Sequence, residues 1–248
     1  GQGAFMDSQD DAVELARAMV QIGNELDKTI EALVTNMNQP LGRAVGNANE
    51  MIQAIEILKG NGPEDLEELV CRLAGSMLSQ AGQEPSRKAG YDSAYERLQS
   101  GDGVDKLRQI IEWQSGDPRV VDDYSRFPEA DQGDVVEATA RGFIQSIDAY
   151  EIGMAAGELG AGRDTMEDEI DPAAGIFVER KIGDPVDPGD PIFRLEYNST
   201  ANSAGAIDRL RNACVISDEP CEPDPLIHGV LEGTGDYTSL GITYPTVP

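Results

Sequence analysis

Residues 175–197, GIFVERKIGDPVDPGDPIFRLEY, decide how the later part of the chain folds. Apolar and polar residues alternate around Asp-Pro and Pro-Gly-Asp steps, which are turn signals. Alternation of this kind places every second side chain on one face of a strand. The stretch therefore predicts antiparallel strands that are joined by tight turns.

The segments on either side of this stretch add strands and helices. Residues 135–148, VVEATARGFIQSID, predict strand. Residues 150–162, YEIGMAAGELGAG, predict a helix that runs into glycines, and a further short helix is predicted at 201–213. From about Pro128 onward the sequence therefore predicts a small domain of the α+β class.

Before that point the pattern is mostly helical. Ser8 is a good N-cap for a first helix, whose apolar face is predicted as Ala12, Leu15, Met19 and Ile22. Residues 29–37, TIEALVTNM, predict a short buried strand. The other predicted helical faces are Ala44, Ala48, Met51, Ile55 and Leu58, ended by Gly60; Leu66, Leu69, Val70, Leu73 and Met77, opened by Pro63; and Val104, Leu107, Ile110 and Ile111.

The overall fold class predicted from these elements is α/β. Residues 1–127 are assigned to the helical part of an α/β domain and residues 128–231 to a smaller, barrel-sandwich-like α+β domain. Residues 232–248 form a tail without an interpretable pattern.

The charge balance restricts the possible partners. The chain of 248 residues has 46 acidic and 19 basic side chains, a net charge of −27. Such a field repels phosphates, so nucleic acid and anionic membranes are not expected as partners. Two explanations of the acidity stay open: a well-solvated surface, or adaptation to high internal salt.

The compartment is predicted from what the sequence lacks. No apolar run approaches the 18 residues of a membrane span, and the first residues do not resemble a signal peptide. The three cysteines, Cys71, Cys214 and Cys221, are widely spaced, which is typical of reduced thiols in a cytoplasmic protein.

The residues that usually perform catalysis are scarce. The single histidine, His228, lies near the end of the chain, where a surface role is more typical than that of a general base. The glycines of the opening GQG are too few for a dinucleotide fingerprint, and neither a phosphate-binding loop nor metal-ligand spacing of histidine and cysteine occurs. We therefore predict no catalytic residue in this chain.

Five longer motifs occur in a fixed order and carry a family resemblance. They are GQGAFM (1–6), TNMNQPLGRAVGNANE (35–50), GPEDLEELV (62–70), LGAGRDTMEDEID (159–171) and KIGDPVDPGDP (181–191). Together they make residues 1–231 resemble the later part of the pyrimidine-nucleoside phosphorylase and thymidine phosphorylase family, whose members are nearly twice this length.

The resemblance implies a substrate-binding residue and an activity. Phe5 is expected to pack near the pyrimidine base, the alternative being a core phenylalanine. The family's activity is phosphorolysis of a pyrimidine nucleoside, thymidine or uridine, to free base and pentose 1-phosphate, with phosphate as co-substrate. The residues that hold phosphate, sugar and base in the family lie upstream of the matched part. The resemblance thus implies a truncated fragment that is inactive alone, and a homodimer when full length.

The resemblance also implies a monovalent cation, usually potassium. Its ligands in the family lie on both sides of the point where the matched part begins. Those carried over to this chain fall on the backbone carbonyls of Leu41 and Ala44 and on the side chain of residue 53. That residue is Gln53, where the family pattern has glutamate. Hard oxygen ligands suit such a cation, although an amide removes one negative charge.

Two other functions were weighed against this one. VERKIGDPVDPGDPIFRLEY also resembles the hairpin around the modified lysine of biotinyl and lipoyl carrier domains, but no lysine follows Lys181. A carrier role is therefore not expected. The remaining alternative is a non-catalytic acidic binding or assembly module derived from the same fold.

Overall fold

The computed structural model describes residues 1–248 apart from 2, 164, 199–201 and 243–248. The contacts within the chain divide it into two compact units. Unit 1 consists of Gly1–Met37, Pro63–Ser100 and Pro223–Pro248, and unit 2 of Asn38–Gly62 and Gly101–Glu222. Both units are discontinuous in sequence, whereas the predicted domains 1–127 and 128–231 are continuous ranges; those boundaries stay a prediction.

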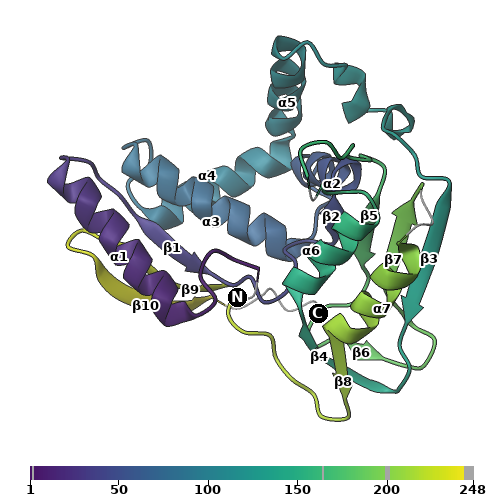
Figure 1. Ribbon diagram of the computed structural model, residues 1–248. Coiled ribbons are helices and arrows are strands. Elements are labelled where there is room, and N and C mark those ends of the chain that lie inside the picture. Colours follow the sequence, from purple (N-terminus) through teal and green to yellow (C-terminus); the bar gives the residue numbers. More distant parts are fainter. Residues whose placement is uncertain (2, 164, 199–201, 243–248) are drawn as a thin grey trace. The chain divides into compact units, whose positions relative to one another are not determined.

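Unit 1 combines a small sheet with helices (Figure 1). Its elements are α1 (Gln9–Glu25), β1 (Ala32–Thr35), α3 (Glu64–Gln80), α4 (Arg87–Ser100), β9 (Ile227–Glu232) and β10 (Asp236–Ile242). The central strand, β9, pairs antiparallel with both β1 and β10. β10 lies in the range that was predicted as a tail without a pattern. His228 is half-buried in β9.

Helix α1 begins where the sequence predicts, but it buries a different face. The Ser8 hydroxyl accepts a hydrogen bond from the backbone N–H of Asp11 at 3.2 Å, as an N-cap should. The predicted apolar face is wrong: Met19 and Ile22 are 55% and 57% exposed. The buried residues of α1 are Ala16, Val20 and Gly23, and Ala16 and Val20 pack with Val34 of β1 and Leu231 of β9.

Helices α3 and α4 pack closely along each other (Figure 1). The predicted apolar face of α3 is only partly right, because Leu69 is buried whereas Val70 and Met77 are 40% and 68% exposed. The contact with α4 uses small residues: Gly75 of α3 and Gly90 of α4 are both buried. Pro63, predicted in the first turn of α3, occupies its N-cap position.

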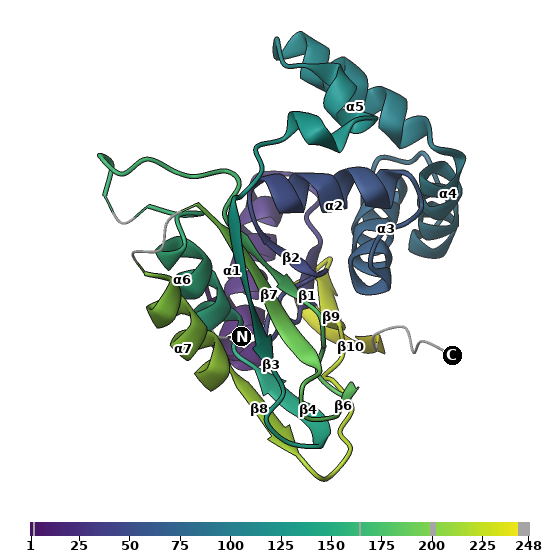
Figure 2. The ribbon, with the colours of Figure 1, turned by 90° about the vertical axis from the view of Figure 1, so that its right-hand side faces the viewer.

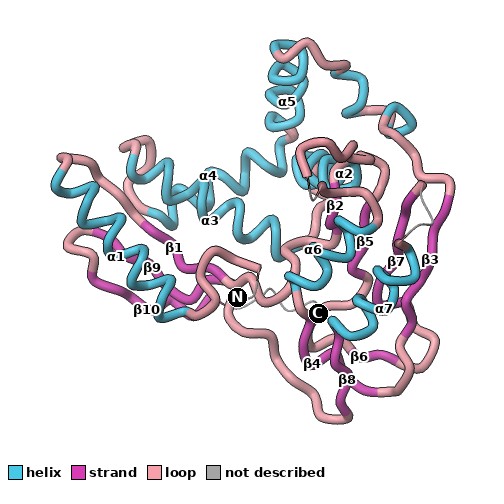
Figure 3. The backbone as a smooth tube through the Cα atoms, in the orientation of Figure 1, coloured by secondary structure: helices cyan, strands magenta, loops and turns pink. Residues whose placement is uncertain are grey.

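Unit 2 is built around two antiparallel sheets, which Figure 3 distinguishes from the helices by colour. Its elements are β2 (Ala44–Gly46), α2 (Ala48–Leu58), α5 (Asp102–Trp113), β3 (Gln132–Glu137), β4 (Gly142–Ile147), α6 (Ala149–Glu158), β5 (Gly175–Val178), β6 (Pro185–Val186), β7 (Pro191–Tyr197), α7 (Ser203–Ala213) and β8 (Cys214–Ser217). The strand orders are β2-β5-β7-β3 and β6-β4-β8.

The antiparallel strands predicted from residues 175–197 are confirmed. β5 pairs antiparallel with β7, with Gly175 opposite Glu196 and Val178 opposite Phe193. The connecting turns place Gly183 and Gly189 at φ angles of 94° and 93°, which favour glycine. The predicted helices at 150–162 and 201–213 are α6 and α7, which lie side by side against the larger sheet (Figure 2).

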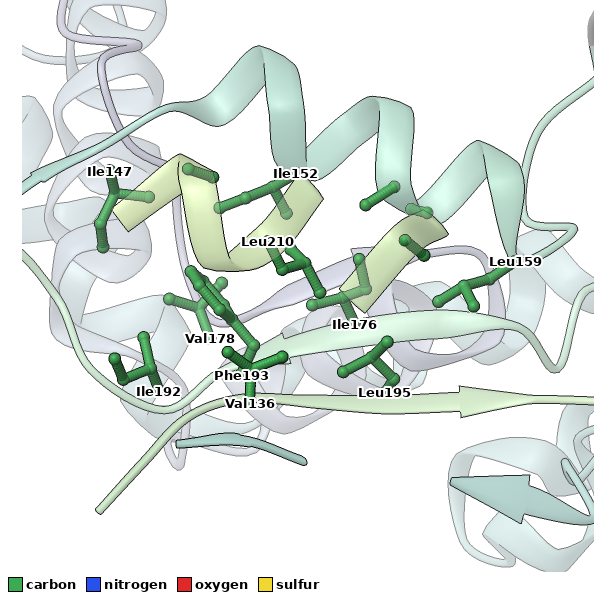
Figure 4. Close-up of a cluster of buried hydrophobic side chains, with 14 of the residues drawn as sticks. Val136, Ile147, Ile152, Leu159, Ile176, Val178, Ile192, Phe193, Leu195 and Leu210 are labelled. Carbon is green, nitrogen blue, oxygen red and sulfur yellow. The ribbon is translucent and has the colours of Figure 1, made fainter. Parts of the chain in front are cut away.

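The core of unit 2 lies between these helices and the sheet. Figure 4 shows side chains of both layers pointing toward one another, among them Ile152 of α6, Leu159 directly after α6, and Leu210 of α7. Phe193 and Leu195 of β7 meet them from the sheet, and all five are at most 2% exposed. Hence the alternating apolar side chains of β7 form the inner face of the domain.

Helix α2 differs from its predicted face at two positions. Ala44 lies in β2 and not in the helix, because the backbone of residues 44–46 pairs with β5. Met51 is 44% exposed, whereas Ile55 is fully buried as predicted. Gly60 ends the helix at a φ angle of 81°. Of the helices in the described part of the chain, none has both the length and the apolarity needed to span a bilayer.

Candidate functional site

Phe5 lies on a tight turn just before α1. The backbone N–H of Ala4 donates to the carbonyl of Gly1 at 3.1 Å, and Gly3 has a φ angle of 86° that favours glycine. The Phe5 side chain is 90% exposed. Phe5 thus lies outside the core of the described residues, and its role beside the base stays a prediction.

The second motif, residues 35–50, forms a closely packed junction in unit 2 from Asn38 onward. The buried Asn49 amide donates to the carbonyls of Val45 and Ile176, at 3.3 and 3.2 Å. A Cβ atom added at Gly46 or Gly175 would lie only 2.6 or 2.5 Å from the Asn49 amide. These glycines therefore permit a close approach of β2, β5 and α2.

The same junction contacts the motif at 159–171. The Asn47 side-chain amide donates to the carbonyl of Ala161 at 2.8 Å. The backbone N–H of Ala48 donates to the carbonyl of Pro172 at 3.0 Å. Hydrogen bonds at the start of α2 thus connect two segments that lie more than a hundred residues apart in the sequence.

Gln53 holds the turn that contains the predicted cation ligands. Its Oε1 atom accepts hydrogen bonds from the backbone N–H groups of Arg43 and Ala44, at 2.6 and 3.1 Å. The amide lies directly over Gly42, where an added Cβ atom would be 2.5 Å from Nε2. Gly42 has a φ angle of 66°, so glycine is required there on two grounds. The cation site at Leu41, Ala44 and Gln53 stays a prediction.

The motif at 181–191 also contacts the turn at residues 39–44. The Lys181 ammonium donates to the carbonyl of Pro40. The Gln39 side-chain oxygen accepts from the backbone N–H of Ile182 at 3.0 Å. The Arg43 guanidinium donates to the carbonyls of residues 178 and 179, at 3.1 and 2.9 Å. No local pattern of the sequence predicts these contacts, although the residues that make them lie within or beside the quoted motifs.

The described residues offer little conventional catalytic chemistry. Burial raises the pKa of Cys214 to about 11 and, together with Glu67 and Glu68, that of Cys71 to about 11. Neither thiol is a thiolate nucleophile at neutral pH. In the described part of the chain, no three side chains of the His, Cys, Asp and Glu types are grouped to hold a metal ion.

The predicted site residues fall into both units. Leu41, Ala44 and Gln53 come together in unit 2, whereas Phe5 belongs to unit 1. In unit 2, hydrogen bonds from the Gln53 side chain fix the backbone of residues 43 and 44. In unit 1, Phe5 offers an exposed aromatic surface on which a planar ring could stack.

Comparison with known proteins connects these segments to two families of domains. The family model described as "Pyrimidine nucleoside phosphorylase C-terminal domain" matches residues 143–217. The family model described as "Glycosyl transferase family, a/b domain" matches residues 1–104. The two matches together cover all five motifs.

Curated relatives match nearly the whole chain. The pyrimidine-nucleoside phosphorylase of Bacillus subtilis (strain 168) is 41% identical over 231 residues, which cover 93% of this chain and 53% of the relative. The pyrimidine-nucleoside phosphorylase of Staphylococcus aureus (strain USA300) is 38% identical over 231 residues with the same coverage. The chain thus spans about half the length of the curated relatives that it matches.

Proposed function

Because the chain belongs to the pyrimidine-nucleoside phosphorylase family, we propose that it forms part of a pentosyltransferase that splits pyrimidine nucleosides with phosphate. A phosphate oxygen forms the new bond to C1′ of the pentose, the glycosidic bond breaks, and the base leaves with that bond's electrons and takes up a proton. The products are the free base and a pentose 1-phosphate.

The observation that carries this proposal is the 41% identity to the Bacillus subtilis relative over 231 residues. The packing supports it, because the motifs at 35–50, 159–171 and 181–191 contact one another in unit 2 through Asn47, Gln39 and Lys181. Catalysis in such a site depends on positioning phosphate and on stabilising the charge of the departing base.

We further propose that this chain is an incomplete part of the enzyme and is inactive alone. An apolar stripe on α1, formed by Leu15, Met19, Ile22 and Leu26, supports this proposal. These side chains are 37–66% exposed and follow helical spacing. Exposed apolar stripes of this kind usually contact further polypeptide.

We expect the chain alone to release no free base. Purified protein is mixed with thymidine or uridine and phosphate, and the base is measured by chromatography against a protein-free blank. A second sample contains the chain preceded by its upstream coding region, if that region is open. Turnover by the chain alone would contradict the fragment proposal. A closed upstream frame with no turnover would favour the alternative, a non-catalytic acidic binding or assembly module.

Phe5→Ala in the intact enzyme is expected to weaken nucleoside binding selectively. Loss of an aromatic stacking contact is worth about 0.5–1.5 kcal/mol, so the KM for the nucleoside should rise roughly 3- to 10-fold. The KM for phosphate should stay unchanged. In the chain alone, where Phe5 is 90% exposed, the same substitution should hardly move the melting temperature.

Trp113→Ala provides the matched control for this substitution. Trp113 is another strongly exposed aromatic residue, 75% exposed at the end of α5. The Trp113→Ala substitution should leave the KM for the nucleoside and the KM for phosphate unchanged. Equal effects of the two substitutions, or an unchanged nucleoside KM for Phe5→Ala, would remove Phe5 from the base site. Homodimer formation, a cytoplasmic location and the choice between thymidine and uridine stay predictions.

A further inference from the structure

The turn at residues 39–44 is held by groups of the chain itself. We propose that the Gln53 amide and the Lys181 ammonium take the place of the bound monovalent cation that the family resemblance implies, so that this turn forms without one. The proposal concerns the turn alone and goes beyond the proposed reaction.

The Gln53 side chain does not fit a cation ligand. Its Oε1 atom already accepts two backbone N–H groups, those of Arg43 and Ala44. The same two donors identify this atom as oxygen, because an amide nitrogen cannot accept them. The remaining polar atom, Nε2, lies over Gly42 and is a hydrogen-bond donor. An amide N–H donor carries a partial positive charge and cannot coordinate a cation.

A glutamate at this position would behave differently. One carboxylate oxygen could accept the N–H groups of Arg43 and Ala44, and the second would stay available as a charged ligand. Gln53 therefore keeps the hydrogen bonds that close the turn and loses the group that would attract a cation.

Lys181 supplies a positive charge beside the same turn. Its ammonium donates to the carbonyl of Pro40, the residue before Leu41. The Arg43 guanidinium binds the carbonyls of Val178 and Glu179 close by. Two side-chain cations thus lie between residues 40–43 and 178–181, so that positive charge is already present beside the turn. The residues present do not fit a bound monovalent cation.

The experiment measures melting temperature in potassium chloride and in tetramethylammonium chloride at equal ionic strength. Tetramethylammonium is too large for a site made of carbonyl oxygens, so any difference reports a specific potassium site. The wild-type protein should melt within about 1 °C in the two salts. The double variant Gln53→Glu/Lys181→Met should melt about 2–4 °C or more higher in potassium, because a ligand stabilises the state that binds it.

Single variants and an exchange measurement complete the test. Lys181→Met should lower the melting temperature equally in both salts, and Gln53→Glu should gain part of the potassium preference. Hydrogen exchange of the Arg43 and Ala44 amides in the wild-type protein should be equally slow in both salts; this measurement does not depend on the variants folding. A potassium preference of the wild type that Gln53→Ala abolishes would overturn the proposal. So would a folded double variant without any potassium preference.

Discussion

In potassium chloride raised from about 0.01 M to about 1 M, the protein is expected to melt at least ~10 °C higher, because screening acts over a Debye length that falls from about 30 Å to about 3 Å. The net charge is −27. The folded chain crowds these charges closer together than the unfolded chain does, so screening relieves repulsion mainly in the folded state. The measurement is a thermal melt followed at increasing salt.

The ion pairs of the structure show why the repulsion among acidic side chains stays large and can be reduced by added salt. Bases are shared among acids: Arg126 binds both Asp117 and Asp123, at 3.0 and 3.2 Å. The Arg209 guanidinium binds both Glu151 and Glu158. With 19 bases for 46 acids, most carboxylates lack a base of their own. Exposed ion pairs contribute little, about 0–1 kcal/mol each, so their loss at high salt does not offset the gain.

Two acidic segments of the sequence should contribute most to the rise of the melting temperature with salt. Nine acids lie between positions 164 and 190, against Arg180 and Lys181. A second run consists of Asp218, Glu219, Glu222 and Asp224. Most of the gain from screening should come at low salt, and a continued gain at molar salt would favour adaptation to high internal salt.

Two controls separate screening from other effects of the solute. Sucrose stabilises folded proteins by exclusion from their surface and leaves charge interactions in place, so it should reproduce only a small part of the gain. Tetramethylammonium chloride should reproduce the gain at low ionic strength, since screening does not depend on a specific cation site. A melting temperature that stays flat across the salt range would mean that the acidic surface is merely solvated.

The order and kind of most elements could be predicted from the sequence, whereas the buried faces of the helices could not. Periodicity locates α1, but two apolar stripes compete on that helix. The stripe with the smaller residues, Ala16, Val20 and Gly23, is buried, because only small side chains allow α1 to lie close to β1 and β9. Periodicity alone therefore assigned the wrong face.

At the candidate site, too, local sequence patterns predict only part of what the structure shows. The motifs at 35–50 and 181–191 contact each other, and Gly46 permits a close approach to Asn49. The pairing of Lys181 with Pro40 spans 141 positions and depends on how β2 meets β5. No local pattern encodes such a contact, since it exists only once the sheet has formed. The sequence analysis likewise included Ala44 in a helical face, although strand pairing places it in β2.

Helix α4 was not predicted at all, and the reason lies in its contact with α3. It lacks an apolar stripe, and its buried residues are only Gly90 and Leu98. A Cβ atom added at Gly90 would lie 2.2 Å from the carbonyl oxygen of Gly75, and one added at Gly75 would lie 2.5 Å from the backbone nitrogen of Tyr91. The two helices therefore meet backbone to backbone, through residues that carry no hydrophobic signal.

Gly90→Ala is accordingly expected to destabilise unit 1 by about 2 kcal/mol or more, because the methyl group collides with backbone that cannot rotate away. The urea midpoint is the measurement. Gly153→Ala is the matched control: Gly153 is also inside a helix, α6, but an added Cβ atom meets nothing within 4 Å. There the substitution should stabilise by about 0.5–1 kcal/mol, since alanine favours helix over glycine.

The two glycine substitutions should thus shift stability in opposite directions. A local readout is available at Tyr91, whose hydroxyl donates to Glu68 of α3 at 2.5 Å. Burial and this hydrogen bond raise the pKa of Tyr91 above its ordinary value. When Gly90→Ala forces the helices apart, that pKa should fall back toward normal, as absorbance titration of the tyrosines would detect. A midpoint and a Tyr91 pKa that both stay unchanged would mean that α3 and α4 do not meet through these glycines.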